Sequence, residues 1–206
     1  MKVIFAHGFE GSPDGSKPTY MREELGWDVI APILSTKGWT IENETDVLLG
    51  VIDENPDVDL ISGSSMGGLA ALNASAQRPD LNFKLLLFAP AFGLADGLRR
   101  DYNKLQLAGW KIKGSVPYEH RGLGQTIELG YDFLQAADKM SWPEPAHQCI
   151  IIHGTDDTIV PIERSQKMAT QLPGKIQLIE VNDGHRLQQS LEHIAKAADK
   201  LLTANS

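Results

Sequence analysis

The feature that most constrains the fold of this chain is an alternation of short apolar runs with longer segments of helical periodicity. The apolar runs, rich in β-branched residues, are Val3–Ala6, Asp28–Leu34, Val58–Ser62, Lys84–Ala89, Cys149–His153 and Ile176–Val181. Between them, apolar residues recur three and four positions apart in Glu42–Asp53, Met66–Gln77, Ile162–Gln171 and Gln188–Leu202. Near-continuous apolar strands separated by helices are typical of a parallel sheet covered on both faces. The alternation therefore predicts an α/β fold.

One stretch departs from this rhythm. A length of 206 residues is typical of one domain, 1–206, and no repeat or linker divides it. From Gly93 to His147 the pattern favours helical pieces broken by Gly and Pro, with no convincing strand. Six Lys/Arg and two acidic residues lie between Gly97 and Arg121, a local charge of +4 in a chain of net charge −8. We expect residues 93–147 to form a small helical lid, with either a solvated basic face or cations that help to hold an anionic substrate.

Charge and cysteine usage exclude several classes of protein. Acidic residues outnumber basic ones by 27 to 19, which argues against a broad nucleic-acid or anionic-membrane surface, since both require clustered Lys and Arg. The single cysteine, Cys149, permits no intramolecular disulfide and lies in an apolar run typical of a core. The first residues hold too few apolar side chains for a signal peptide, and no run approaches the roughly 18 residues that a membrane span needs. These observations predict a cytoplasmic protein without membrane insertion; they leave its oligomeric state open.

A nucleophile motif follows the third apolar run. Gly63-Ser64-Ser65-Met66-Gly67 matches G-x-S-x-G and stands between a predicted strand and a predicted helix, the context of a nucleophile elbow. In such a turn the serine hydroxyl projects from the sheet edge, and the N–H of the next residue, Met66, faces developing negative charge. The alternative is a Gly/Ser-rich turn without chemistry. The context favours Ser65 as a nucleophile.

A serine nucleophile requires a base and an orienting acid. In open α/β sheets these should follow the carboxyl ends of later strands. His153-Gly154-Thr155-Asp156-Asp157 follows the fifth apolar run, and Asn182-Asp183-Gly184-His185 follows the sixth. The resulting order Ser65, Asp157, His185 is the chain order of α/β hydrolases, not that of the chymotrypsin or subtilisin types.

These segments resemble the serine α/β-hydrolase superfamily, in particular small single-domain YqiA-type bacterial esterases and related acyl thioesterases. The resemblance spans residues 3–185 and rests on His7-Gly8-Phe9, Gly11-Ser12, Gly15-Ser16-Lys17, Gly63–Gly68, Phe88-Ala89-Pro90-Ala91, His153–Pro161 and Gly184-His185. It implies an α/β-hydrolase fold that lacks two leading strands, with six strands in the order 2-1-3-4-5-6 and helices on both faces. The elbow and the H-G-x-x-D-x-x-V-P turn occur throughout the superfamily, so they indicate the fold better than the substrate.

The resemblance also assigns roles. It implies Ser65 as nucleophile, His185 as general base and then acid, and Asp157 as the acid that accepts the Nδ1–H of His185, with Asp156 as a competitor. The oxyanion hole would consist of the backbone N–H groups of Phe9 and Met66. Each assignment is an expectation for the structure to meet.

Several other residues favour a structural role. We expect His7 to brace the loop that forms the hole and His153 to brace the acid turn. No ligand spacing indicates a metal, and no cofactor is expected. The segment Gly11–Lys17 lacks the Gly-Lys-Ser/Thr ending of a phosphate loop, and Pro18 removes a backbone donor.

The sequence limits the substrate only loosely. Apolar residues expected near the elbow predict a hydrophobic acyl pocket, lined by Phe92, Leu94 and Ile159. A lid of this size favours a small-molecule ester of short to medium chain. An acyl-CoA or acyl-protein thioester is the alternative, because Arg99–Arg121 is basic. A catalytically silent binding module with the same fold is the alternative from another class.

Overall fold

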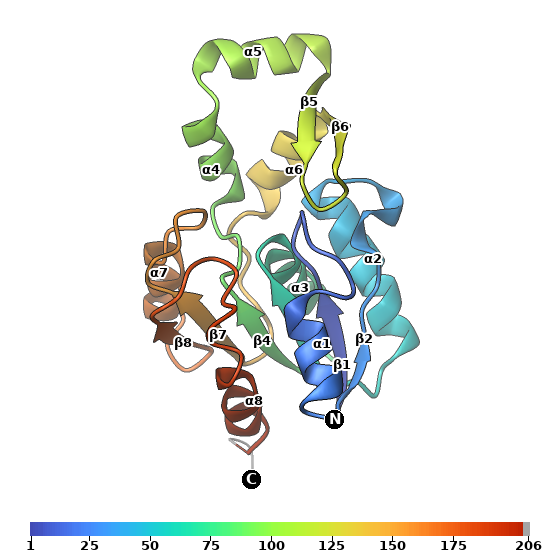
Figure 1. Ribbon diagram of the computed structural model, residues 1–206, viewed down its shortest axis with the longest axis vertical. Helices are drawn as coiled ribbons and strands as arrows, with labels where there is room; N and C mark the ends of the chain where they lie inside the picture. The colour runs from blue at the N-terminus through green and yellow to red at the C-terminus, as the bar shows by residue number, and fades with distance from the viewer. Residues whose placement is uncertain (204–206) are drawn as a thin grey trace.

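The centre of the molecule is a six-stranded parallel sheet. A computed structural model, which describes residues 1–203, places the strands in the order β2-β1-β3-β4-β7-β8 (Figure 1). Their bounds are Lys2–Ala6 (β1), Asp28–Ile30 (β2), Leu60–Ser64 (β3), Lys84–Phe88 (β4), Cys149–Gly154 (β7) and Ile176–Val181 (β8). The α/β class and the parallel sheet are as predicted. With strands numbered along the whole chain, their order in the sheet departs from the predicted 2-1-3-4-5-6 at its last two members, because two further strands, β5 (Ser115–His120) and β6 (Gln125–Gly130), precede β7.

Helices cover both faces of the sheet, which explains why its strands are apolar almost without interruption. On one face, α1 (Ser16–Glu23) and α8 (His193–Thr203) pack on side chains that include Phe5, Phe88 and Ile152. The other face lies under α2 (Ile41–Glu54), α3 (Met66–Gln77) and α7 (Glu163–Gln171). A short 3-10 helix, η1 (Leu34–Lys37), leads into α2.

The start of the last helix differs from the prediction. Residues 188–192 are in a loop and α8 begins at His193, because the Asp183 carboxylate holds this loop in a turn. It accepts hydrogen bonds from Gln189 N (2.8 Å) and Ser190 Oγ (3.0 Å). A side-chain bond of this kind offers the backbone an alternative to helix.

The insert between β4 and β7 rises from the carboxyl end of the sheet (Figure 1). It holds three helices, α4 (Leu94–Asp101), α5 (Lys104–Lys113) and α6 (Asp132–Met140), and a separate antiparallel hairpin of β5 (Ser115–His120) and β6 (Gln125–Gly130). The expectation of a wholly helical insert without strands is therefore wrong. The hairpin escapes pattern analysis because its strands are polar, β5 contains Pro117, and few of its side chains are buried.

Within residues 1–203, no helix has the length and apolar character that crossing a bilayer requires.

Candidate active site

Ser65 occupies a strained turn between β3 and α3. Its φ of 54° and ψ of −118° lie outside the regions that side-chain-bearing residues ordinarily adopt. Backbone bonds hold it there: Ser65 N donates to Phe88 O (2.9 Å), and Ser65 O accepts from Ala91 N (3.0 Å) and Leu69 N (3.0 Å). Strain that persists in this way is characteristic of functional sites. The turn has the geometry that the G-x-S-x-G motif predicts.

The glycines of the motif are required by close backbone approach. A Cβ at Gly63 would lie 2.7 Å from Gly67 O, and one at Gly67 would collide with the carbonyl oxygens of Ala6 and His7. The helix that begins at Met66 can therefore press directly against the end of β1. Met66 is the first residue of α3, where backbone N–H groups have no acceptor within the helix.

The loop after β1 lies against Ser65. A Cβ at Gly8 would be 3.2 Å from the Cβ of Ser65. The Gly8 carbonyl accepts from His7 Nδ1 (2.9 Å) and Gly11 N (2.8 Å), while His7 Nε2 accepts from Leu34 N (3.3 Å). Because Gly8 O and Phe9 N belong to one peptide plane, these bonds fix the direction of the Phe9 N–H. Burial lowers the pKa of His7, which keeps the ring neutral, with one donor and one acceptor.

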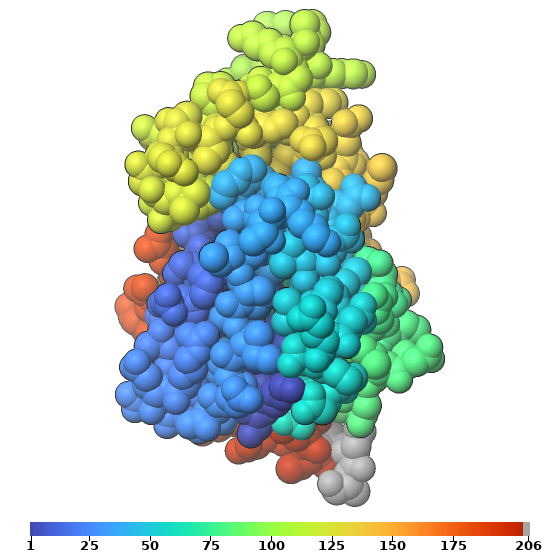
Figure 2. Space-filling view, turned by 90° about the vertical axis from the view of Figure 1, so that its right-hand side faces the viewer, coloured from blue at the N-terminus to red at the C-terminus, as the bar shows by residue number. Residues whose placement is uncertain are grey.

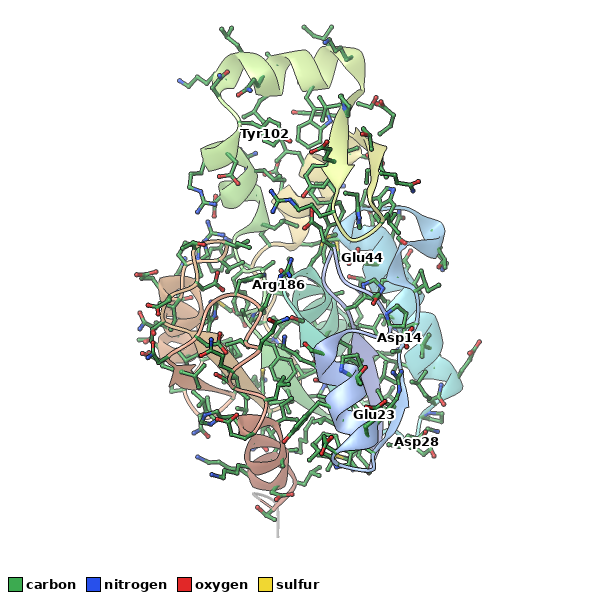
Figure 3. All side chains as sticks on the ribbon, in the orientation of Figure 1. Asp14, Glu23, Asp28, Glu44, Tyr102 and Arg186 are labelled. Carbon is green, nitrogen blue, oxygen red and sulfur yellow. The ribbon has the colours of Figure 1, made fainter. Side chains whose placement is uncertain are left out.

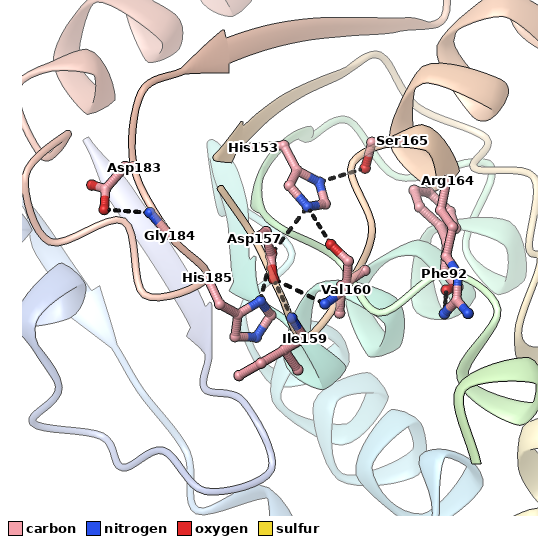
Figure 4. A network of polar contacts seen from close by, with 10 residues as sticks. All are labelled: Phe92, His153, Asp157, Ile159, Val160, Arg164, Ser165, Asp183, Gly184 and His185. Atoms are coloured by element: carbon pink, nitrogen blue, oxygen red, sulfur yellow. Dashed lines mark hydrogen bonds and ion pairs between the residues drawn. The ribbon is translucent and has the colours of Figure 1, made fainter. Parts of the chain in front are cut away.

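Asp157 is the acid that contacts His185. After β7 the chain turns back on itself, and the Asp157 carboxylate accepts four hydrogen bonds (Figure 4). Oδ1 accepts from the backbone N–H groups of Ile159 (2.8 Å) and Val160 (2.9 Å). Oδ2 accepts from His185 Nδ1 (2.7 Å) and His153 Nε2 (3.1 Å). Burial alone would raise the pKa of Asp157, but the bonds from His153 and His185 outweigh it and hold the pKa well below its usual range.

The two competing carboxylates are placed differently. Asp156 is exposed, and its backbone N–H donates to Asp183 O (3.1 Å). Asp183 bonds within its own loop, with Oδ1 accepting from Gly184 N (2.7 Å). Of the three carboxylates near this turn, only Asp157 bonds to the His185 ring among residues 1–203.

His153 braces the acid from beneath, as expected. Its ring is completely buried, Nδ1 meets Ser165 Oγ at 2.8 Å, and Nε2 also donates to Val160 O at 3.0 Å. The sequence did not indicate that this bracing includes a direct bond to Asp157.

The His185 loop is tied to the first helix. A Cβ at Gly154 would collide with the carbonyl oxygen of Asp183, so the loops after β7 and β8 are packed tightly. Across the site, Lys17 Nζ donates to Arg186 O (2.7 Å) and lies 5.4 Å from the centre of the Phe88 ring. Burial lowers the pKa of Lys17 to about 8. Sequence patterns gave no signal for this tether.

The three residues expected to line a pocket occupy different surroundings. Phe92 is completely buried and stacks on Trp142, with ring centres 5.9 Å apart. Leu94 begins α4 and is half-buried. Ile159 is 58% exposed and lies beside His185 in Figure 4. Phe92 therefore presents no surface to a ligand in this conformation, whereas Ile159 does.

The β5–β6 hairpin grips the loop that carries Phe9. His120 Nε2 meets Phe9 O at 2.8 Å, and Glu10 Oε1 accepts from Tyr118 OH (3.0 Å) and Arg121 N (3.3 Å). In Figure 2 the yellow atoms of the hairpin rest directly on the blue N-terminal segment. Sequence analysis missed these contacts because it did not predict the hairpin.

Two other features bear on the chemistry. Cys149 is buried in β7, where burial raises the pKa of its thiol, so it is a core residue as expected. Within residues 1–203, no three His, Cys, Asp or Glu side chains are grouped so as to hold a metal ion.

Comparison with known proteins gives a family, relatives and structural neighbours. The model of the uncharacterised protein family UPF0227 matches residues 2–201. The palmitoyl-protein thioesterase ABHD10 is 26% identical over 166 residues in mouse and 29% over 191 residues in Pongo abelii. Those matches cover 71% and 82% of this chain, but only 52% and 61% of the relatives, so the chain spans little more than half of their length.

Solved structures share the fold. Mouse α/β-hydrolase domain-containing protein 10 superposes with a TM-score of 0.79 and 21% identity, covering 100% of this chain and 90% of its own. Est1E from Butyrivibrio proteoclasticus, solved with ferulic acid, gives a TM-score of 0.75 and 20% identity, covering 97% and 86%. This similarity establishes the α/β-hydrolase fold.

Proposed function

The chain belongs to the UPF0227 family and has the α/β-hydrolase fold, and from this premise we propose that it is a serine hydrolase of carboxylic esters. The observation that carries the proposal is the pairing of a strained Ser65 turn with a His185 ring bonded through Nδ1 to a buried carboxylate. A binding module requires neither backbone strain nor a charged, desolvated acid below a histidine. The relatives named as thioesterases support hydrolysis of a bond to an acyl group.

In the proposed reaction Ser65 Oγ attacks the acyl carbon and its proton passes to His185 Nε2. The Nδ1–H stays on the Asp157 carboxylate, which holds the tautomer in which Nε2 is the base and stabilises the imidazolium that forms. Among the hydrogen bonds found in residues 1–203, the His185 ring bonds to Asp157 and not to Ser65 Oγ; catalytic bonds of the latter kind often form only when substrate is bound.

The backbone N–H groups of Phe9 and Met66 donate hydrogen bonds to the carbonyl oxygen and stabilise the negative charge that develops on it. His185 then protonates the leaving alcohol, and the acyl-enzyme forms. A water molecule that gives its proton to His185 attacks the acyl carbon, and Ser65 leaves as the free hydroxyl. No cofactor is needed for any of these steps.

We further propose that residues 93–147 form a lid within a single domain. The grip of the hairpin on Phe9 and Glu10 supports this, since it brings the insert to the loop beside Ser65. Leu94 and Ile159 are the proposed contacts of the acyl group, and the modest size of the lid favours short to medium chains.

A thioester substrate is the second candidate, and the names of the relatives favour it. The arginines that suggested an anionic leaving group are already paired. Arg99 Nη2 lies 2.6 Å from an Asp138 oxygen, and Arg100 Nε lies 2.9 Å from an Asp101 oxygen. A recognition role for these two arginines therefore loses support, while thioester chemistry itself needs only Ser65, His185 and the hole.

The test is labelling with a fluorophosphonate probe together with hydrolysis of p-nitrophenyl esters from acetyl to palmitoyl and of the matching thioesters. We expect labelling at Ser65 and turnover that Ser65→Ala lowers by about 10⁶ with an unchanged melting temperature. A wild-type protein that neither labels nor hydrolyses any member of the panel would instead be a silent module. Full turnover by Ser65→Ala would remove Ser65 from the mechanism.

A further inference from the structure

The helix α5 has two apolar faces, only one of which packs on the protein. Trp110 points inward: it is buried, its Nε1 donates to Leu129 O (2.9 Å), and its ring lies 5.4 Å from that of Tyr102. Figure 3 shows Tyr102 at the junction of α4 and α5. Leu105 and Ile112 are 84% and 86% exposed. Seven residues make about two helical turns, so these two side chains lie on one face, away from Trp110.

Lysines border this outer face. Lys104 and Lys111 lie along one side of it and Lys113 along the other, as their positions on a helix require. None of the ion pairs found among residues 1–203 involves these three lysines. Outside residues 97–121 the chain carries a net charge of −12, so positive charge is concentrated at this end of the molecule.

The helix is also the outermost element of the fold. In Figure 1 it crosses the end of the molecule farthest from the amino ends of the strands, and in Figure 2 its lime-green atoms form that end. Its outer face is therefore convex and open to a large flat partner.

We propose that this face, defined as Lys104, Leu105, Lys111, Ile112 and Lys113, docks the protein peripherally on an anionic lipid surface. The two exposed apolar side chains flanked by lysines are the feature that this face shares with interfacial helices. A second copy of the chain is disfavoured, since it would bring like-charged lysines together. The overall acidic charge excludes a broad basic surface, but it leaves this confined one free to act within the Debye length of a membrane.

The test is co-sedimentation with vesicles of phosphatidylcholine alone and of phosphatidylcholine mixed with phosphatidylglycerol. We expect binding to the anionic vesicles only, weakened by high salt. The double variant Leu105→Ser/Ile112→Ser should lower the partition coefficient at least tenfold, and replacing the three lysines by Gln should lower it about fivefold per charge. Ile33→Ser, a change at another strongly exposed apolar residue, should have no effect.

Circular dichroism spectra and melting temperatures in solution should be the same for all these proteins, which shows that they are folded. Equal sedimentation of wild type and the Leu105/Ile112 variant, or no sedimentation with anionic vesicles, would overturn the proposal. The proposal would also be overturned by a dimer in solution that dissociates in the Leu105/Ile112 variant while vesicle binding is absent. Binding of an acidic protein without any vesicle binding would overturn it as well.

A second inference comes from the buried histidine of the hairpin and rests on the proposed function. His120 is 2% exposed; its Nδ1 accepts from Leu123 N (3.1 Å), so the ring proton is on Nε2 and donates to Phe9 O (2.8 Å). The Phe9 ring packs against the His120 ring, with centres 5.2 Å apart. The peptide before Phe9 is fixed by the bonds to Gly8 O, and His120 fixes the peptide after it.

We infer that His120 is a positioning residue that keeps the Phe9 N–H aimed at the oxyanion. The hole is then completed by the lid, because its second donor is held by a residue of β5. Removing one oxyanion donor lowers turnover by about 10² to 10³, which sets the upper limit for displacing it.

Two variants separate positioning from folding. Gln places an amide donor near the position of Nε2, whereas Asn can still accept from Leu123 N but cannot reach Phe9 O. We expect His120→Asn to lower kcat 10-fold to 100-fold with KM little changed, to weaken a boronic acid transition-state analogue in parallel, and to leave fluorophosphonate labelling of Ser65 detectable. His120→Gln should recover most of kcat.

Equal kcat in wild type and His120→Asn would overturn this inference while the proposed function stands. Equal losses in the Asn and Gln variants, tracking a lower melting temperature, would also overturn it, since they would mark a packing role. Absence of labelling and turnover in the wild type would instead contradict the proposed function itself.

Discussion

Replacing Asp157 by Asn tests the electrostatic centre of the site with almost no change in shape. The carboxylate uses Oδ1 for two backbone N–H groups, of Ile159 and Val160, and Oδ2 for the ring N–H groups of His153 and His185. All four partners are donors, and Asn can offer only one accepting oxygen. One pair must therefore face an NH₂ group.

The backbone donors cannot change, so the Asn oxygen should remain with them and the NH₂ should face the imidazoles. His153 can keep its Nε2–H on Val160 O (3.0 Å). His185 must then accept at Nδ1 and carry its proton on Nε2, where it can no longer take a proton from Ser65. We expect kcat to fall by about 10⁴, or about 5 kcal/mol of transition-state stabilisation, with KM little changed.

The measurement is kcat and KM for p-nitrophenyl butyrate at pH 7.5, with circular dichroism to confirm folding. Asp156→Asn is the matched control, because Asp156 is exposed and next in sequence; it should retain activity within about twofold. The reasoning is refuted if Asp156→Asn loses activity and Asp157→Asn keeps it, or if both variants turn over at the wild-type rate.

Three further predictions follow from buried groups. Glu44, on the first turn of α2 (Figure 3), has a buried Oε2 that finds no hydrogen-bond partner among residues 1–203, and burial raises the pKa of its carboxyl group well above the usual value. The folded state therefore loses stability as pH rises above the unfolded pKa of about 4.3. Glu44→Gln should raise the melting temperature at pH 8 but not at pH 4. Because the pKa of Lys17 is lowered to about 8 in the folded state, Lys17 loses its proton there at a lower pH than in the unfolded chain, so the free energy of unfolding should rise with pH between about 8 and 10. Lys17→Met should abolish that rise in denaturant titrations. It should also lower kcat, because Arg186 O loses its hydrogen-bond donor. A Cβ at Gly67 collides with two backbone oxygens, so Gly67→Ala should yield insoluble or unfolded protein, whereas Gly50→Ala, on α2 with open space around it, should express normally.

The parts of the fold that could be predicted share one physical origin. Strands buried on both faces carry apolar residues at nearly every position, so the sequence predicts β1, β3, β4 and β7 as apolar runs. The nucleophile elbow could be predicted for a related reason: at Gly63 and Gly67 the neighbouring backbone is so close that only glycine fits. Where the structure admits only one kind of residue, the sequence pattern predicts that structure.

The parts that could not be predicted are those where several different residues would satisfy the same structure. Either Asp156 or Asp157 fits the spacing of the acid turn, and only the direction of the side chain after β7 separates them. The Lys17–Arg186 tether ends on a backbone carbonyl, which any residue supplies, so it has no partner to find in the sequence.

The hairpin shows how this difference matters for function. Besides a short inward face formed by Val116, Tyr118 and Leu129, its strands are stabilised by hydrogen bonds to the backbone of Phe9 and to the carboxylate of Glu10. His120 therefore reads in isolation as a lone histidine, although its ring joins an element more than 100 residues away in the chain. Under the proposed mechanism, His120 of the insert would act on an oxyanion donor, the Phe9 N–H, rather than on the serine, the acid or the base. The same proposal would couple substrate selection to chemistry, because a ligand that displaces the hairpin would also displace Phe9.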